Sequence, residues 1–366
     1  MPDTGQNGAA DPPEPAAASS GRDPRRRGGL FRRFADAPWW VHVLAALGAV
    51  FALLVATAVV LALVFVDIAW EHGPLGRDIP AQTEVTGEEA VELARRFAPE
   101  LRYDSAELFV PIPRSAYVSR TQLKEEKGRL VRLVEDVVDE GILPHELGEC
   151  TKACLLFLDV RGAEPEPPKH SERTYDDIEN KLLRSGTRPT VYYHVTRYDD
   201  TDQYAVQYWF LYFFNYRLNE HESDWEQITV HLDEDRRPVD IYYSAHEGGN
   251  TREFEKIAEG EHPVVYPARG SHANYFGPGK HDVEIVCKRL FGSFKHCVRG
   301  GKLLQDVADG RGAKLALGDY ELAQLGGPIY VGSYGSGNYV VLTRKPSVLR
   351  DPRLRALWLD PLQPLR

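Results

Sequence analysis

A long apolar run without any charge constrains this chain more than any other feature of its sequence. Residues 43–66 are 24 consecutive residues that include no Asp, Glu, Lys or Arg. As a helix this run would be roughly 36 Å long, enough to cross the ~30 Å hydrocarbon core of a bilayer. A buried core helix would carry a polar stripe, which this run lacks. We therefore expect one transmembrane helix within 39–70, with Trp39, Trp40 and Trp70 at the head-group level.

The charges on either side of this run predict its orientation. Asp67 and Glu71 follow it, whereas six arginines precede it: Arg22, Arg25, Arg26, Arg27, Arg32 and Arg33. By the positive-inside rule, the N-terminus stays in the cytoplasm and the C-terminal part is exported. The run is longer than the ~7–15 apolar residues of a signal peptide, and no small-residue cleavage pattern follows it. We therefore expect an uncleaved signal anchor.

Composition divides the chain into six segments. Residues 1–38 are rich in Pro, Gly, Ala and Ser and predict a disordered cytoplasmic tail with an arginine cluster. The anchor (39–70) and a short linker (71–82) follow. We expect a helical N-terminal part of the exported domain (83–189), a β-sandwich (190–345) and a C-terminal tail (346–366). The net charge of −10 at pH 7 gives no basic footprint, which excludes a nucleic-acid-binding protein.

Hydrophobic patterns predict an α+β fold. Thr86 and Glu89 form a capping box before a helical pattern that ends at Pro99, and further helices are expected at 122–138 and 175–183. From residue 190 onward the pattern changes to short β-branched and aromatic runs between Gly, Asp, Asn and Pro. The predicted strands are 191–195, 204–214, 225–232, 239–245 and 263–266, with a last hairpin of 328–333 and 338–343. Their spacing favours a jelly-roll-like antiparallel β-sandwich core with flanking helices.

The four cysteines lie in two local pairs, Cys150 with Cys154 and Cys287 with Cys297. In an exported domain an even number of cysteines favours disulfide bonds, and we expect these local pairings among the three connectivities. A zinc site is the alternative. Structural zinc sites usually space both cysteine pairs by two to four residues, and the second pair is wider than that.

The most informative polar pattern lies at the start of a predicted strand. Side chains alternate between the two faces of a strand, so Asp224 and Glu226 share a face with three aliphatic residues that should be buried. A buried carboxylate costs several kcal/mol unless it is paired, hydrogen-bonded or bound to a cation. A metal ion with His221 as a further ligand is one answer. An ion pair with Arg217 or Arg269, or a position at the solvent rim, is the other.

Two polar loops at predicted strand ends are candidate ligand-binding segments, because loops at strand ends often build sites. The first is SAHEGG at 244–249, and the second is RGSHANYF at 269–276. The residues that we expect to contact a ligand are Glu247, Arg269, Ser271, His272 and Asn274.

Five sequence motifs follow one another in the second half of the chain. They are QYWFLYFFN (207–215), HESDWE (221–226), SAHEGG (244–249), HPVVY (262–266) and GSHANYF (270–276). Together they resemble the vacuolar protein sorting-associated protein 62 family and its bacterial relatives. The earlier segment LARRFAP (93–99) is similar to the opening of many bacterial members, so that the resemblance covers about residues 90–340.

The pattern His-x-x-Asp-Trp-Glu is also similar to the heptapeptide of necrosis- and ethylene-inducing toxins. Those toxins are β-sandwiches that hold a divalent cation near this motif and bind glycolipid head groups. The resemblance implies a cation at His221, Asp224 and Glu226, with Asn215 and His246 as further ligands. The residue before His221 is glutamate where the toxins carry glycine, and Asn215 is an amide where they carry an acid. Such oxygen-rich ligands favour Mg²⁺ or Ca²⁺, with Mn²⁺ and Zn²⁺ as alternatives.

Together these features predict a single-pass protein of a bacterial cell membrane, with its N-terminus in the cytoplasm and its C-terminal domain outside. We expect this domain to bind a divalent cation and to recognise a glycan or a lipid head group. One alternative is a metal-dependent hydrolase of the cell envelope, with Glu222, Glu247 or His272 as general base. The other is a structural or interaction protein without metal.

Overall fold

The structure is a computed structural model, and it forms two compact units, Met1–His72 and Gly73–Arg366. The residues that it describes are 38–41, 43–44, 46–48, 50–51, 79–127, 130–136, 138, 154–163, 171–217, 220–246, 248–289, 295–299, 305–327, 334–335, 351–362 and 364.

The first unit is described only in part. Its described residues between 39 and 51 are helical, and they expose large apolar side chains such as Trp39 at 77% and Phe51 at 69%. Most of the uncharged run lies outside the described residues. Among the residues described, none of the helices is both long and apolar enough to span a bilayer. The transmembrane helix therefore stays a prediction.

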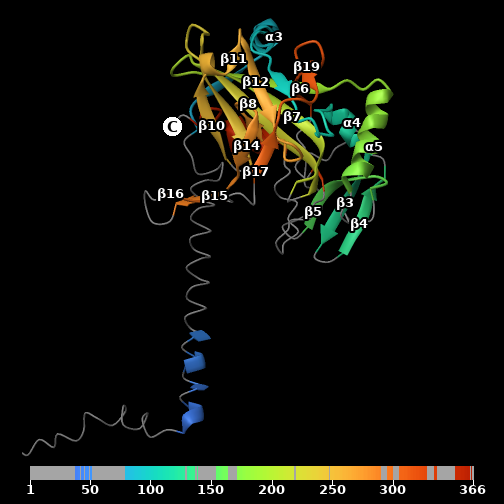
Figure 1. Ribbon diagram of the computed structural model, residues 1–366, viewed down its shortest axis with the longest axis vertical. Coiled ribbons are helices and arrows are strands. Elements are labelled where there is room, and N and C mark those ends of the chain that lie inside the picture. The colour runs from blue at the N-terminus through green and yellow to red at the C-terminus, as the bar shows by residue number, and fades with distance from the viewer. Residues whose placement is uncertain are drawn as a thin grey trace, which may run out of the picture. The chain divides into compact units, whose positions relative to one another are not determined.

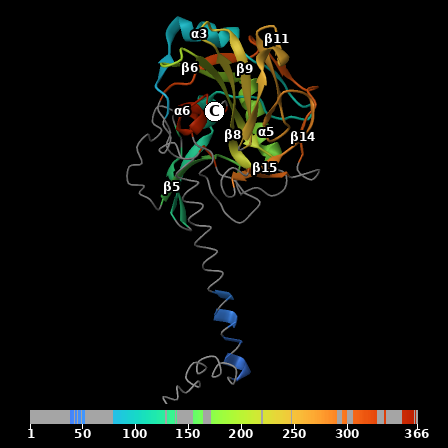
Figure 2. The ribbon, with the colours of Figure 1, turned by 90° about the vertical axis from the view of Figure 1, so that its left-hand side faces the viewer.

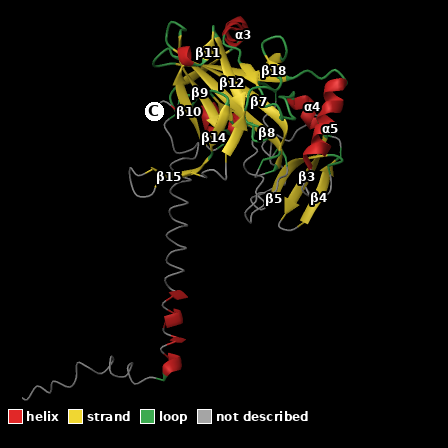
Figure 3. Ribbon diagram, in the orientation of Figure 1, coloured by secondary structure: helices red, strands yellow, loops and turns green. Residues whose placement is uncertain are grey.

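A seven-stranded sheet forms the centre of the second unit (Figures 1 and 3). Its strands along the hydrogen-bonded path are β1 (Gln82–Val85), β6 (Thr190–Tyr198), β7 (Tyr204–Asn215), β8 (His221–Leu232), β9 (Pro238–Ala245) and β10 (Gly248–Glu253). These strands pair antiparallel, and β19 (Glu321–Gln324) adds a parallel partner to β6. Every residue of β7 and β8 is buried. Both faces of the sheet are therefore covered, which is why these strands are so rich in aromatic residues.

A second sheet covers one face of the first, together with helix α3 (Gly87–Arg96). Its strand order is β11 (Ala258–Glu259), β12 (His262–Pro267), β2 (Glu100–Arg102) and β18 (Lys314–Leu315), and β13 (Asn274–Tyr275) pairs with β12. Tyr243 of β9 donates a hydrogen bond to the carbonyl of Val264, and Tyr208 of β7 donates one to the carbonyl of Ala94. We call this covered side, which carries Tyr208 and Tyr243, the front face. Large antiparallel sheets with few helices confirm the predicted α+β class.

Two of the predicted helices are present. Helix α3 follows Thr86, as expected, although the side chain of Thr86 makes no capping hydrogen bond. Helix α5 (Ser171–Arg184) contains the helix predicted at 175–183. A further short helix, α4 (Arg114–Val118), was not predicted.

The helix predicted over 122–138 is wrong. Strands β3 (Thr121–Lys127) and β4 (Leu130–Glu135) form a hairpin there, and β5 (Cys154–Val160) pairs with the other edge of β3 (Figure 1). Leu133 and Val134, which would share one face of such a helix, are 52% and 46% exposed in the hairpin. Pairing with β5 overrides the helical spacing, and Gly128 between the two strands was the sequence signal for a hairpin. The segment 83–189 thus holds strands as well as helices.

Two small strand pairs complete the described sheets. β14 (Gly279–Asp282) pairs with β17 (Gln305–Ala308), and β15 (Glu284–Arg289) pairs with β16 (Lys295–Arg299). The second register sets Cys287 opposite Cys297, and facing residues of an antiparallel pair lie within the Cα spacing of a disulfide. Cys150 and the hairpin predicted at 328–333 and 338–343 lie outside the described residues. Both disulfides therefore stay predictions.

The opposite side of the central sheet, the back face, is covered by the end of the chain. The C-terminal segment, residues 351–362, contains η6 (Pro352–Leu354) and α6 (Ala356–Leu359), and α6 lies against the sheet (Figure 2). Trp358 stacks on His194 with 3.7 Å between ring centroids, and Gln207 donates a hydrogen bond to the carbonyl of Leu357 at 2.7 Å. This part of the predicted tail is therefore packed on the core.

Candidate functional site

The alternation predicted along β8 is confirmed. Asp224 and Glu226 lie opposite Tyr212 and Phe210 of β7, and they share the front face with Ile228. The two acidic residues are only 8% and 7% exposed. The pattern thus correctly identified two buried acidic side chains, and the surrounding side chains have to compensate the cost of burying them.

His272 supplies the positive charge beside Asp224. Its Nδ1 lies 3.0 Å from Oδ2 of Asp224, and its Nε2 lies 3.6 Å from Oε1 of Glu107. The imidazole has no exposed surface and stacks on Tyr212 with 3.9 Å between centroids. Asn215 donates a hydrogen bond of 3.0 Å to the same oxygen of Asp224. We call this group the Asp224 cluster, and its members are Glu107, Asn215, Asp224, Glu226 and His272.

The pKa values within the cluster follow from burial and from these pairings. Burial opposes a charged imidazole, but the carboxylates of Glu107 and Asp224 outweigh it and raise the pKa of His272 to about 10. The pKa values of Glu107 and Asp224 are lowered in turn, against the effect of burial. Burial and the charge of Asp224 raise the pKa of Glu226, which accepts a hydrogen bond from Ser244. At neutral pH the imidazolium of His272 therefore lies between the carboxylates of Glu107 and Asp224.

A second group, the Asp306 cluster, surrounds a carboxylate of β17 that no sequence pattern singled out. Nε2 of His246 lies 2.7 Å from Oδ2 of Asp306, and the hydroxyl of Tyr275 donates to the same oxygen at 2.8 Å. Nε of Arg217 lies 3.7 Å from Oδ1. Asp306 has no exposed surface, and burial alone would raise its pKa, but the hydrogen bond with His246 helps to lower it. The cluster comprises Arg217, His246, Tyr275 and Asp306.

The loop of residues 268–274, here called the roof loop, connects the two clusters. It contributes His272 to the Asp224 cluster, and its Gly270 amide donates a 2.7 Å hydrogen bond to Oε2 of Glu107. The amide group of Asn274 donates to the carbonyl of Gln227 at 3.3 Å and to the hydroxyl of Ser244 at 3.4 Å. The loop is therefore fastened to both β8 and β9.

Three non-glycine residues around the clusters have left-handed backbone conformations. The φ angles are 56° for Ser223, 56° for His246 and 54° for His272. Such conformations are strained for residues other than glycine, and they persist where the surrounding contacts over-determine them. The hydrogen bonds of His246 and His272 to buried carboxylates are contacts of this kind.

The contacts divide the predicted metal ligands between places. Asn215, Asp224 and Glu226 belong to one cluster, whereas His246 binds Asp306. His221 lies opposite Asn215 and interacts electrostatically with Asp224, and its Nδ1 lies 2.6 Å from the carbonyl oxygen of Ser223. Among the described residues, no three or more His, Cys, Asp and Glu side chains are arranged to share a metal ion. Oδ2 of Asp224 already accepts two hydrogen bonds. The divalent cation therefore stays a prediction.

The other predicted residues fall in different surroundings. Arg269, Ser271, His272 and Asn274 all lie in the roof loop, with Nη1 of Arg269 at 3.9 Å from Oδ1 of Asp104. Glu247 lies outside the described residues.

Glu222, one of the three candidate general bases, joins elements of the fold. Glu222 accepts hydrogen bonds from the hydroxyl of Tyr175 at 2.8 Å and from the amide of Val160 at 3.2 Å, so it ties α5 and β5 to the end of β8.

Sequence reasoning missed two acids that the structure places in the clusters. A polar residue lies within two positions of each, Ser105 before Glu107 and Gln305 before Asp306, so neither position carried a pattern that predicts a buried acid. Nothing in the sequence identified their partners.

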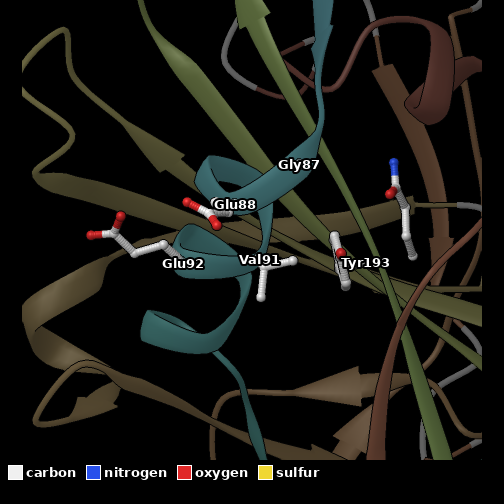
Figure 4. A pocket seen from close by; sticks show the side chains of 6 residues that line it. Gly87, Glu88, Val91, Glu92 and Tyr193 are labelled. Atoms are coloured by element: carbon white, nitrogen blue, oxygen red, sulfur yellow. The ribbon is translucent and has the colours of Figure 1, made fainter.

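An open cavity of about 530 Å³ lies elsewhere, between α3, β6 and β19. Its lining is acidic on the side of α3 and includes Val91 and Tyr193 (Figure 4). None of the predicted site residues lines it: the lining residues are Gly87, Glu88, Val91, Glu92, Tyr193 and Gln324.

Comparisons with known proteins give only a distant similarity of fold. No family model and no curated protein matches the chain. A structure described as "Toxin fold for microbial attack and plant defense" has 15% identity and a TM-score of 0.30, over 68% of this chain and 80% of that chain. One described as "NLPPya in complex with mannosamine" has 16% identity and a TM-score of 0.27, over 54% of this chain and 71% of that chain. Both scores are below 0.5, so neither similarity assigns a function.

Proposed function

We propose that the unit Gly73–Arg366 recognises a hydroxyl-rich head group, carried by a glycan or a glycolipid, at the Asp306 cluster. The observation that carries this proposal is how Asp306 is held. Two side chains that reach the surface, His246 and Tyr275, both bind a carboxylate that has no exposed surface itself. The buried acid fixes their positions, and such preorganisation reduces the entropy that binding costs.

The rim of this cluster offers the groups that sugar hydroxyls bind. The side chains of Arg217, His246 and Arg269 are 32%, 27% and 40% exposed. Guanidinium groups donate hydrogen bonds, whereas an imidazole can donate and accept them, which suits a ligand whose hydroxyls do both. Tyr275 stacks on His281 with 3.8 Å between centroids, and both rings are half-buried. A flat aromatic surface beside polar groups suits the apolar face of a sugar ring.

The Asp224 cluster positions this rim and does not contact the ligand in our proposal. Its imidazolium fastens the roof loop to the front face through Asp224, and Glu107 holds the same loop from the other side. Arg269 lies within this loop, and Tyr275 follows it directly. Loss of the buried ion pair would therefore loosen the rim without removing any ligand-binding side chain.

We place this unit outside a bacterial cell, attached by the predicted signal anchor. Support comes from the uncharged run at 43–66, from the arginines that precede it, and from the exposed apolar side chains of Trp39, Leu44 and Phe51. A helix that exposes such side chains to water would be unfavourable, and a bilayer would cover them.

The test is binding of the full chain, in detergent micelles, to a glycan array and to vesicles with and without glycolipid. We expect His246→Gln and Arg217→Gln to weaken binding by about tenfold or more each, because each removes a directed polar contact. The assay is run with MgCl₂, CaCl₂ or a chelator, and we expect the same binding in all three. Product analysis of the bound ligand separates recognition from hydrolysis.

The chain offers a matched control for this experiment. His231 and Asp240 form another His–Asp pair, and His231 faces the C-terminal segment on the back face. Asp240→Asn should leave binding unchanged. The proposal is overturned if no ligand on either panel binds, or if both rim variants bind as tightly as the unaltered chain.

A further inference from the structure

Three buried N–H groups on the back face have no acceptor among the described residues. They are the indole Nε1 of Trp209, the indole Nε1 of Trp225 and the amide Nε2 of Gln227. The exposed fractions of these residues are 0%, 2% and 2%. A buried donor without an acceptor is costly, so that three on one face call for an explanation.

The strand register makes these three residues neighbours. Trp209 of β7 lies directly opposite Gln227 of β8. Trp225 is two residues before Gln227 on the same strand, and side chains two apart point to the same face. The three donors thus come from adjacent positions of one face, on the two strands in which every residue is buried.

Arg355 of the C-terminal segment adds a positive charge at the same place. Its guanidinium carbon lies 6.0 Å from the centre of the Trp209 ring, and its Nη1 donates a 2.8 Å hydrogen bond to the carbonyl of Trp225. Glu226, Asp224 and Asp351 interact electrostatically with this guanidinium, the first two from the other face of β8.

The occupant of such a place must be an acceptor of hydrogen bonds. The side-chain oxygen of Gln227 already accepts from Thr229, and the carbonyl of Trp225 already accepts from Arg355. A water molecule would bring two donors of its own into a group made of donors. An oxyanion brings acceptors only and also meets the charge of Arg355.

We propose that the back face holds a site for a small oxyanion, of the carboxylate or phosphate class, between Trp209, Trp225, Gln227 and Arg355. The C-terminal segment closes this site, since Arg355 comes from it and Trp358 lies 6.0 Å from Trp209 between ring centres. This site is separate from the Asp306 cluster and does not depend on the function proposed there.

The test is nuclear magnetic resonance of the full chain labelled with ¹⁵N-tryptophan, in detergent micelles. Acetate and inorganic phosphate are titrated at constant pH and ionic strength, with chloride as the reference anion. The indole signals of Trp209 and Trp225, assigned with Trp209→Phe and Trp225→Phe, should shift with saturation. The signal of Trp39, in the other unit, should not move.

Two variants decide whether the shift reports a site. Gln227→Leu should weaken binding of the anion by about tenfold. Gln324→Leu, which removes an exposed amide hydrogen-bonded to Glu84, should leave anion binding unchanged. Arg355→Gln should abolish the saturable shift, and the melting temperature shows whether that variant is folded. Signals that do not move, or that move equally in chloride, overturn the proposal and leave buried water as the partner of these donors.

Discussion

Replacement of His272 by glutamine tests the central electrostatic feature of the front face. His272→Gln keeps a planar polar side chain but removes the positive charge between Asp224 and Glu107. Both carboxylates would then be buried without the imidazolium that now compensates them. We expect the folded unit to lose stability near neutral pH and to lose little at high pH.

The magnitude follows from the pKa of His272, which rises from the ordinary 6.5 to about 10. Each unit of pKa is worth about 1.4 kcal/mol, so the imidazolium contributes about 5 kcal/mol. The folded-state pKa is raised, so this contribution is complete below pH 6.5, about 4 kcal/mol at pH 7 and lost by about pH 10. Removal of one partner of a buried ion pair costs about 3–5 kcal/mol in other proteins, which agrees.

The assay is urea unfolding of the full chain at several pH values between 6 and 9.5, followed by tryptophan fluorescence. Between about pH 7 and 9.5 the unaltered chain should lose about 1.4 kcal/mol of unfolding free energy per pH unit, a slope that the variant should not show. The double variant His272→Gln/Asp224→Asn should recover part of the loss, because it removes one of the two uncompensated charges. Parallel pH profiles for the unaltered chain and His272→Gln would refute the buried imidazolium.

Three other perturbations test separate parts of the structure. A chelator should leave the melting temperature unchanged if the imidazolium of His272 is sufficient to compensate Asp224, whereas a fall of several degrees would support the predicted cation. Burial lowers the pKa of His194, so the contribution of His194 to stability should be constant above pH 6.5 and should fall below it, and His194→Gln should show a flatter acid limb in the same unfolding assay. A Cβ at Gly312 would lie 2.3 Å from the carbonyl oxygen of Asp104, so Gly312→Ala should cost about 1–3 kcal/mol, whereas Gly277→Ala, with open space around it, should melt like the unaltered chain.

Local patterns predicted the strands well and the helices partly. The run 204–214 matched β7 to within one residue, because aromatic and β-branched side chains suit a sheet that is buried on both faces. The segment 122–138 was predicted as a helix but forms the strands β3 and β4. Its apolar residues have helical spacing, but β5, which begins at Cys154, offers an edge to which β3 binds. A pattern within one segment cannot report a partner strand farther along the chain.

The same limit applies to the site. Alternation along β8 was enough to place Asp224 and Glu226 on the buried face, since the period of two is a property of any strand. The resemblance then suggested a cation as their partner. The structure brings His272 beside Asp224 from a loop 48 positions away, and Glu107 from the segment between β2 and α4. His272 was expected to contact a ligand, and in the structure it is fully buried between Asp224 and Glu107.

What the sequence determines by itself is local: a 24-residue uncharged run, the strand and helix periods, and two acids on a face that must be buried. Only the tertiary structure decides which distant side chain compensates each buried charge or buried hydrogen-bond donor. His246 meets Asp306 across 60 positions of chain, and Trp209 and Trp225 lie beneath a segment that begins at Asp351. Periodicity depends on backbone geometry over a few residues, whereas the compensation of a buried charge or donor depends on every segment that packs around it.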